Sequence, residues 1–349
     1  MSLTVEAVTQ RRPAEIVLQR ATRRLHGKAV IIGLLAVGSY AGLVFVANGP
    51  LLAVPLACVL IVALIATGTC VMHDANHGAF GVSRRVNMVL SYSGDMLGAN
   101  SWLWRQKHNV MHHGNTNVVG IDTDIEQMPY ARLAPDQPWK PWHRYQHIYI
   151  WALYGFLTLQ WMLWADFEHL VTGHIGSQPM RRKASPSDLA LLGSGKLAHL
   201  GWAVVLPMFF HRWWMVLAFY VACSWVVGFV LAVFFQVAHC VDNTTFGDPS
   251  TPRRGDDFVA HQLRTTANVG CDTPVIGPSV AWLMGGLHHQ IEHHLAPGLP
   301  HTSYPDMAEG IKDLCAATGT DYRVHPSLWA AMASHTRWLR AMGAPPTAG

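Results

Sequence analysis

Two long apolar runs follow each other near the beginning of the chain. The first covers residues 29–48 and would be about 30 Å long as a helix, which matches the hydrocarbon thickness of a bilayer. Asn48, Gly49 and Pro50 then form a turn signal, and residues 51–72 make a second apolar run. The pattern predicts a hairpin of two membrane-spanning helices whose outer ends lie on the same side of the membrane.

Three further apolar stretches lie later in the chain, at residues 148–165, 197–210 and 213–238. Three crossings would separate the polar segments 73–147 and 239–349, which share the histidine motifs described below. If these motifs meet at one site, the number of crossings between them must be even. We therefore expect residues 148–165, which are rich in Trp and Tyr, to lie in the membrane interface and the other two stretches to cross.

Composition supports a membrane protein with one membrane domain. Hydrophobic residues make up 50% of the chain and charged residues 13%, about half of the roughly 25% charge of soluble domains. The six cysteines form no CxxC pair, which argues against zinc knuckles, iron–sulfur ligation and disulfides. The 21 histidines, by contrast, are clustered and need an explanation.

The basic residues predict the orientation and the outer segments. Residues 1–28 have a basic, amphipathic pattern, and we interpret them as an N-terminal interfacial segment in preference to a signal peptide. The segment 73–147 is also basic, so the positive-inside rule places it in the cytoplasm. We expect a membrane domain over residues 29–305 and a C-terminal cytoplasmic helical tail over residues 306–349.

Three histidine clusters occupy these polar segments. In each, two histidines stand four residues apart, a spacing that puts both rings on one face of a helix. The second and third clusters add an adjacent histidine, and the third also includes a glutamine. The candidate ligands are His73 and His77, then His108, His112 and His113, and finally His289, Gln290, His293 and His294.

Imidazole is the commonest metal ligand in proteins, and so many histidines without cysteine suit iron, zinc or copper. Because a zinc site usually closes with four ligands, this number implies more than one metal ion. Ligating histidines usually donate their second N–H to a carboxylate or carbonyl. The supporting candidates closest in sequence are Asp74, Asp122, Asp124, Asp242 and Glu292, and a solvated surface carboxylate is the competing interpretation for each.

The three clusters resemble the histidine boxes of the membrane fatty acid desaturases. HDANH at 73–77, HNVMHH at 108–113 and QIEHH at 290–294 match the family's pattern in order and spacing, over roughly residues 29–305. The resemblance implies two iron ions, and it adds His239, just after the last apolar run, as a ligand. Gln290 stands where many acyl-CoA desaturases have a histidine; a glutamine at this place resembles front-end and bacterial lipid desaturases. The metal ligand that this histidine would supply could therefore be His289, the side-chain carbonyl of Gln290 or a bound water.

The expected fold is therefore all-α and integral to the membrane, with about four transmembrane helices and interfacial helices under a cytoplasmic helical cap that carries the di-metal site. The expected activity is O₂-dependent desaturation of a fatty acyl chain linked to CoA, acyl carrier protein or lipid. We expect the chain to sit in membrane lipid, in a bacterial plasma membrane. The substrate-binding residues are not predicted.

No haem domain, GxGxxG fingerprint or ferredoxin-like cysteine set is visible in the sequence, so we expect a separate electron donor, a ferredoxin or cytochrome. We expect no nucleic-acid partner. The same iron chemistry would also serve an acyl acetylenase, hydroxylase or ketolase. A non-enzymatic metal transporter is a remote alternative, because transport sites need polar residues near the bilayer midplane and the apolar runs hold few.

Overall fold

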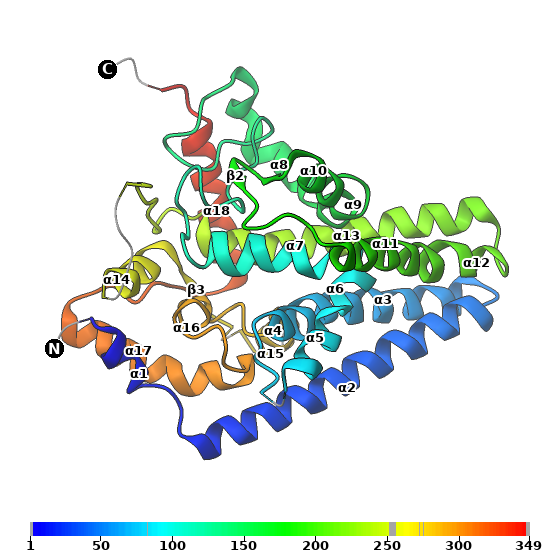
Figure 1. Cartoon of the computed structure of the whole chain (residues 1–349), viewed down its shortest axis with the longest axis horizontal. Helices are drawn as coiled ribbons and strands as arrows, with labels where there is room; N and C mark the ends of the chain where they lie inside the picture. Colours follow the sequence, from blue (N-terminus) through cyan, green and yellow to red (C-terminus); the bar gives the residue numbers. More distant parts are fainter. Residues whose placement is uncertain (1–2, 82, 251–255, 272, 275, 347–349) are drawn as a thin grey trace.

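The computed structural model describes residues 3–81, 83–250, 256–271, 273–274 and 276–346. Four helical segments in this part of the chain are long and apolar enough to cross a membrane: Glu15–Val46, Pro50–Asn76, Pro186–Met208 and Trp213–His239. Figure 1 shows these long helices extending together to one side, with the short helices gathered at the other. The expected all-α fold with four spans is confirmed.

The first two spans form the predicted hairpin. Helix α2 (Glu15–Phe45) precedes α3 (Pro50–Ala66), whose first residue, Pro50, needs no N–H partner there. At Gly42 the two helices come so close that a Cβ would lie 2.9 Å from Leu56, the kind of approach that small residues permit in membranes. Helix α2 begins at Glu15, so the second half of the expected interfacial segment 1–28 is continuous with the first span. Residues 1–2 of that segment lie outside the described residues.

The second span continues beyond α3 into the first histidine cluster. A π-helical turn η1 (Thr67–Met72) joins α3 to α4 (His73–Asn76), so His73 stands at the end of a span, as expected. Short helices follow: α5 (Arg84–Ser91), α6 (Ser93–Met96), α7 (Ser101–Arg105) and the π-helical η2 (Gln106–His112). A long loop then leads to the 3₁₀ turn η3 (Pro141–Tyr145).

The segment expected in the interface is a broken helix. Helices α8 (Gln146–Tyr154) and α9 (Leu157–Gln160) belong to two halves bent by 71°. The bend packs against α13 (Trp213–His239), since a Cβ at Gly228 would lie 2.6 Å from the Gly155 carbonyl and Trp225 donates to the Ala152 carbonyl at 3.1 Å. A bent pair suits a re-entrant or interfacial segment as well as a broken span, so its position stays a prediction.

The chain reaches the third span through the π-helical η4 (Trp161–Ala165), α10 (Asp166–Thr172) and the small hairpin of β1 (His174–Ile175) and β2 (Gln178–Pro179). This span consists of α11 (Pro186–Leu200), the π-helical η5 (Gly201–Val205) and α12 (Leu206–Met208). It begins eleven residues before the expected 197–210 because Ser185 caps α11 with Asp188. Helix α13 matches the expected 213–238.

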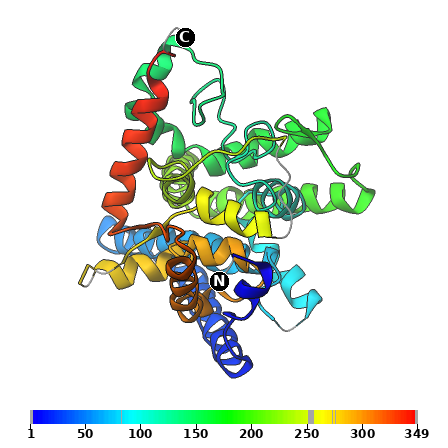
Figure 2. The ribbon, with the colours of Figure 1, turned by 90° about the vertical axis from the view of Figure 1, so that its left-hand side faces the viewer.

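The remaining helices form a cap, which we define as residues 240–346. They are α14 (Asp256–Thr265), α15 (Ile276–Met284), α16 (Gln290–Leu295), the 3₁₀ turn η6 (His301–Ser303), α17 (Tyr304–Thr318) and α18 (Leu328–Gly343). Strands β3 (Asn268–Val269) and β4 (Val324–His325) pair in parallel between them. Figure 2 shows α14, α16 and α17 together in front of the long helices.

A small hydrophobic core fixes α16 within the cap. Ile291 is fully buried with Leu263 of α14 and Ile311 of α17. Because Ile291 and Leu295 use one face of this short helix for packing, the neighbouring polar residues of the third histidine cluster are free to face the other spans.

Candidate metal centre

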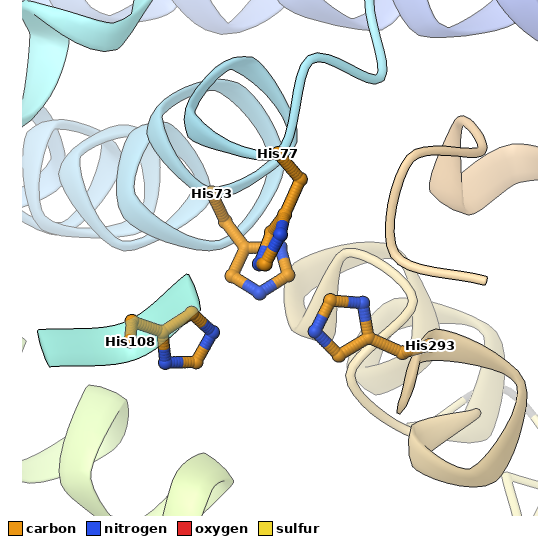
Figure 3. A group of neighbouring side chains, drawn as sticks. All are labelled: His73, His77, His108 and His293. Carbon is orange, nitrogen blue, oxygen red and sulfur yellow. The ribbon is translucent and has the colours of Figure 1, made fainter. Parts of the chain in front are cut away.

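Four histidines from three separated segments form the first histidine set. His73 and His77 come from the end of the second span, His108 from η2 and His293 from α16, and their ligand nitrogens all lie within 4.8 Å of one another. Figure 3 shows these rings pointing toward a common space. The ring of Trp104 stacks on His108 with centroids 4.3 Å apart and so closes one side of the set.

A second histidine set lies beside the first. His112 of η2, His239 at the end of α13 and His294 of α16 also place their ligand nitrogens within 4.8 Å of one another. His113 joins the two sets, because it groups with His293 and His294 and its Nε2 lies 3.2 Å from Nε2 of His108.

The backbone of η2 explains how one short segment serves both sets. The sequence suggested an α-helix, with His113 about 100° around from His112. The segment is instead π-helical, and the His113 N–H bonds to the His108 carbonyl at 3.0 Å. This wider turn brings His108 and His113 to the same side and leaves His112 directed at His239.

The buried nitrogens of this site fit metal ions. Within the described residues, Nε2 of His73, His77 and His112 and Nδ1 of His113 are buried without a hydrogen-bond partner. Each such atom costs about 1–3 kcal/mol if it stays unsatisfied. Metal ligation would satisfy Nε2 of His73, His77 and His112, and the adjacent sets provide room for two ions.

Burial also keeps these rings in the form that binds metals. It lowers the pKa of His108 to about 3 and lowers the pKa of His113, His293 and His294 as well. Neutral imidazoles with a free lone pair are the ligating form. His112 differs: burial alone would lower its pKa, but the charge and the hydrogen bond of Asp122, together with the charge of Asp124, outweigh burial and raise it.

Hydrogen bonds define the tautomers of the second set. Asp122 accepts from Nδ1 of His112 at 3.0 Å, and the Gln262 side-chain carbonyl accepts from Nδ1 of His294 at 2.9 Å. The Thr265 carbonyl faces Nδ1 of His239 at 3.4 Å. With each proton at Nδ1, the Nε2 lone pairs face one another across the site.

Carboxylates lie behind the first set. Asp74 faces Nδ1 of His73 at 3.5 Å, and Asp124 faces Nδ1 of His108 at 3.5 Å. Lys107 contacts Asp124 at 3.0 Å; although burial would raise the pKa of this carboxyl, Lys107 and the neighbouring histidines hold it well below its usual range. Asp74, Asp122 and Asp124 therefore occupy the supporting positions expected from the sequence.

Sequence reasoning missed several supporting residues. Nδ1 of His293 lies 3.0 Å from the Tyr304 hydroxyl, and Nδ1 of His294 lies 3.1 Å from the Thr116 hydroxyl as well as near Gln262. His301 contacts Asp74 at 2.8 Å. None of these residues stands at a spacing that links it to a ligand, so no local signal in the sequence could have identified them.

The structure places three expected site residues differently. His289 belongs to neither set; its Nδ1 faces Glu292 at 3.6 Å. Glu292 turns away from the site and accepts from Asn268 at 2.9 Å and Tyr322 at 2.8 Å, which fixes the start of α16. Asp242 pairs with Ser334 and Arg337 of α18, so its expected support of a ligand is wrong: the chain turns outward after His239.

Gln290 lies where the sequence left its role open. Its side-chain Nε2 is 2.9 Å from Nε2 of His239 and 3.4 Å from Nε2 of His294, and its Oε1 is buried without a partner in the described part of the chain. A rotation of the amide would present Oε1 to the second set. The geometry thus favours Gln290 over His289 as the neighbour of a metal ion.

A large apolar cavity of about 710 Å³ opens between the four spans. It extends from the turn at Asn48 and Gly49 to Leu64, Leu97 and Val227. Beyond this end, Leu97 and Leu231 close on Gly68, where a Cβ would lie 3.2 Å from Leu231 and 3.5 Å from Leu97. Gly68 precedes His73 by one helical turn, so this constriction separates the cavity from the first histidine set.

Comparisons with known proteins agree with this geometry. A sequence model of the family described as "Fatty acid desaturase" matches residues 49–326. The chain is 35% identical over 288 residues to an sn-1 linoleoyl-lipid 6-desaturase of Synechocystis sp., covering 82% of this chain and 79% of that protein. It is 35% identical over 280 residues to an acyl-lipid (8-3)-desaturase of Physcomitrium patens, covering 79% of this chain and 57% of that protein. An sn-1 linoleoyl-lipid 6-desaturase of Arthrospira platensis is 30% identical over 284 residues, with 80% and 75% coverage.

Proposed function

This chain belongs to the fatty acid desaturase family, and we propose that it uses two histidine-held iron ions and O₂ to introduce a double bond into a lipid-linked acyl chain. It is an oxidoreductase acting on fatty acyl chains, as its relatives are. The observation that carries the iron-dependent mechanism is the convergence of eight histidines from distant segments into two adjacent sets, seven of them buried and His77 half-buried: His73, His77, His108, His112, His113, His239, His293 and His294.

The first iron would be held by His73, His77, His108 and His293, and the second by His112, His239 and His294, with His113 between them and Gln290 beside the second. Iron would activate O₂, the oxidant that, with two electrons and two protons from outside, takes up two hydrogens from an unactivated pair of carbons and leaves as water. The protein holds the imidazole protons at Nδ1, orients the Nε2 lone pairs and excludes water from the buried site. The supporting residues in this scheme are Asp74, Asp122 and Asp124, with Tyr304, Gln262 and Thr116.

The apolar cavity supports the assignment of an acyl substrate. Its volume falls in the range of about 300–1,000 Å³ of ligand sites. Between Pro50 and Leu64 it follows α3 for about 21 Å, as expected for fourteen helical residues. A chain entering past Gly68 would place its inner carbons near His73. Among CoA, acyl carrier protein and lipid, a lipid is favoured as the carrier of the acyl chain, because the relatives named above are desaturases named for acyl chains in lipids.

The remaining parts of the proposal follow from charge and sequence. Electrons would come from a separate ferredoxin or cytochrome. The basic residues of segments 1–28 and 73–147 favour the cytoplasmic face of the membrane for the cap and the histidine sets. Residues 29–305 would act as the membrane domain and residues 306–349 as a cytoplasmic tail, although Tyr304 and α17 pack directly on α16.

Expression in a host that supplies a ferredoxin reductase system tests the proposal. Lipids are analysed by gas chromatography with mass spectrometry, beside a His112→Ala, His113→Ala variant and a His174→Ala control, whose side chain is exposed on β1. We expect a new unsaturated acyl chain in the wild type and the control and none in the double variant. An oxygenated product would move the assignment to a hydroxylase or ketolase, and a triple bond to an acetylenase. Absence of iron from the purified wild type would contradict the iron-dependent mechanism.

A further inference from the structure

A line of polar contacts connects the first span to the first histidine set. Lys28 of α2 donates through Nζ to the Trp282 carbonyl at 2.6 Å and lies 3.2 Å from Nε2 of His301. Nδ1 of His301 lies 2.8 Å from Asp74, and the His301 backbone N–H donates to the same oxygen at 3.0 Å. The other oxygen of Asp74 faces Nδ1 of His73 at 3.5 Å. The line thus links α2, the cap and the end of the second span.

Donors and acceptors alternate along this line. The Asp74 carboxylate accepts, so Nδ1 of His301 carries the proton and its Nε2 offers a lone pair. The Lys28 ammonium can only donate hydrogen bonds, and it lies opposite the Nε2 lone pair of His301. At the other end, Nε2 of His73 is buried, has no hydrogen-bond partner among the described residues and faces the first histidine set. Every contact therefore holds the next group in one orientation.

The position of Lys28 argues against an incidental contact. A lysine this close to a membrane-spanning segment is costly unless it is paired, and such residues tend to be functional. The aromatic ring of Trp282 lies 4.9 Å below Nζ and further stabilises the charge. His301 and Asp74 are 5% and 2% exposed, so water screens the interaction little.

We propose that Lys28 and His301 are positioning residues, which act through Asp74 to orient His73 and to raise the reduction potential of the first iron. This inference rests on the iron site of the proposed function. A positive charge near a metal favours its reduced state, and a carboxylate whose charge is shared with His301 and Lys28 pulls less strongly on the His73 proton. A displacement of the first span would then change the reduction potential of the first iron.

The fold allows this effect to be separated from simple anchoring. Helix α2 is also held by Thr302, which donates to the Ala21 carbonyl at 2.7 Å, and by His26, whose Nε2 lies 3.1 Å from the Phe80 carbonyl. Leu25 and Ile32 are buried beside them. A Lys28→Met variant keeps these contacts and most of the side-chain volume while it removes the charge, so it is expected to fold.

The test compares the full-length wild type with Lys28→Met, Lys28→Arg and Arg24→Met, the last at an exposed position one turn away on α2. Iron per chain is measured by mass spectrometry, the midpoint potential by redox titration and the environment of each iron by Mössbauer spectroscopy. We expect Lys28→Met to retain both irons, to shift the midpoint potential negatively and to alter one of two iron signals. Lys28→Arg should restore much of both properties, and Arg24→Met should match the wild type.

A second variant examines the middle of the line. His301→Leu removes the side-chain donor to Asp74, and we expect the protein to lose iron to a chelator about 10-fold faster, as for other groups that support metal ligands. The inference is overturned if Lys28→Met matches Arg24→Met in potential and spectrum, or if His301→Leu retains iron like the wild type. A wild type without iron would instead overturn the proposed function itself.

Discussion

The two histidine sets share the segments η2 and α16, but they differ in the third segment and in the chemistry that supports them. In the first set, carboxylates stand behind His73 and His108, and a lysine lies beyond each of them: Lys28 through His301, and Lys107 directly. In the second set, His112 alone has a carboxylate in hydrogen-bond contact within the described part of the chain, and neutral oxygens of Gln262, Thr116 and Thr265 hold the other two rings.

This difference indicates that the sets are not equivalent. Negative charge near a ligand strengthens its donation to a metal, while a nearby lysine compensates that charge. The first set has both effects. In the second set, Asp122 and, at 3.6 Å, Asp124 lie beside His112 alone, and the other members have neutral supports and the amide of Gln290. We expect the two ions to differ in affinity and in their response to mutation.

His113 provides the strongest test, because it joins the sets. Its Nε2 lies 3.2 Å from His108 and 3.0 Å from His293. His113→Ala should reduce desaturation more than the roughly 100-fold upper range seen when a supporting residue is removed. Iron per chain should fall with it, and His174→Ala is the control. A variant that kept both irons would show that the sets are independent.

Asp122→Asn should have the next largest effect and should act mainly on the second set. Asp122 accepts from His112 at 3.0 Å and from the Asn117 N–H at 2.8 Å, and it is fully buried. We expect about a 10- to 100-fold loss of iron affinity or activity. Thr116→Val removes a neutral hydroxyl beside His294, and we expect it to reduce iron affinity and activity less than Asp122→Asn does. Equal losses in a chelator competition assay would contradict the distinction drawn between charged and neutral supports.

Gly68→Val tests whether the cavity serves the first set. The added methyl groups would press on Leu97 and Leu231, and crowding of this kind costs about 1–3 kcal/mol. We expect roughly a 10-fold loss of activity on long acyl chains with unchanged iron content. Gly38→Val in α2 is the matched control, since no atom lies within 4 Å of a Cβ there. Loss of iron in Gly68→Val would point to distortion of His73 instead.

Gln290→Ala and His289→Ala separate the two candidates for the variable position of the third cluster. Gln290 contacts His239 and His294, whereas His289 faces Glu292. Loss of one hydrogen bond is worth about 1 kcal/mol, so Gln290→Ala should lower activity about 5-fold. His289→Ala should change it little. The opposite ranking in a product assay would assign the position to His289.

The smallest effect is expected far from both sets, at Asp242. Burial would raise the pKa of this carboxyl, but Ser334 and Arg337 lower it overall. A depressed pKa means that the pair stabilises the fold above the carboxyl's unfolded pKa and loses this effect as the pH falls through the folded value. Because the Asp242 side chain is 37% exposed and that of Arg337 63%, water screens the pair, and Asp242→Asn should cost under about 1 kcal/mol at neutral pH. In acid, the thermal unfolding midpoint of Asp242→Asn should equal that of the wild type. A difference in midpoint that persists in acid would contradict the ion-pair interpretation.

Much of the fold was predictable because its signals are local. The apolar runs gave the spans, and the second and last of them ended beside His73 and His239 as expected. Boundaries set by polar caps were less visible: α11 starts at Pro186 because Ser185 and Asp188 cap it. The kink at Gly155 depends on contact with Gly228, which no local pattern reveals.

In the candidate site, too, some residues were predictable from local signals in the sequence and others were not. Histidine spacing and family resemblance identified the residues that the two sets contain, and the nearby carboxylates Asp74, Asp122 and Asp124 were found by proximity in sequence. Asp242 is closer in sequence to His239 than Asp122 is to His112, but it pairs with Arg337, because α18 packs against α13 there. Proximity in sequence is therefore a weak guide to the partner of a ligand.

The sequence by itself determined which chemistry the chain can perform, since ligand identity and span length are properties of single segments. Only the tertiary structure decided how the ligands divide between two sets, that His113 joins them through a π-helical turn, and that Tyr304, Gln262, His301 and Lys28 stand behind them. These contacts join residues far apart in the chain, and they form because Ile291 and its neighbours bury α16 in the cap. Such packing follows from three-dimensional complementarity, which no spacing along the chain records.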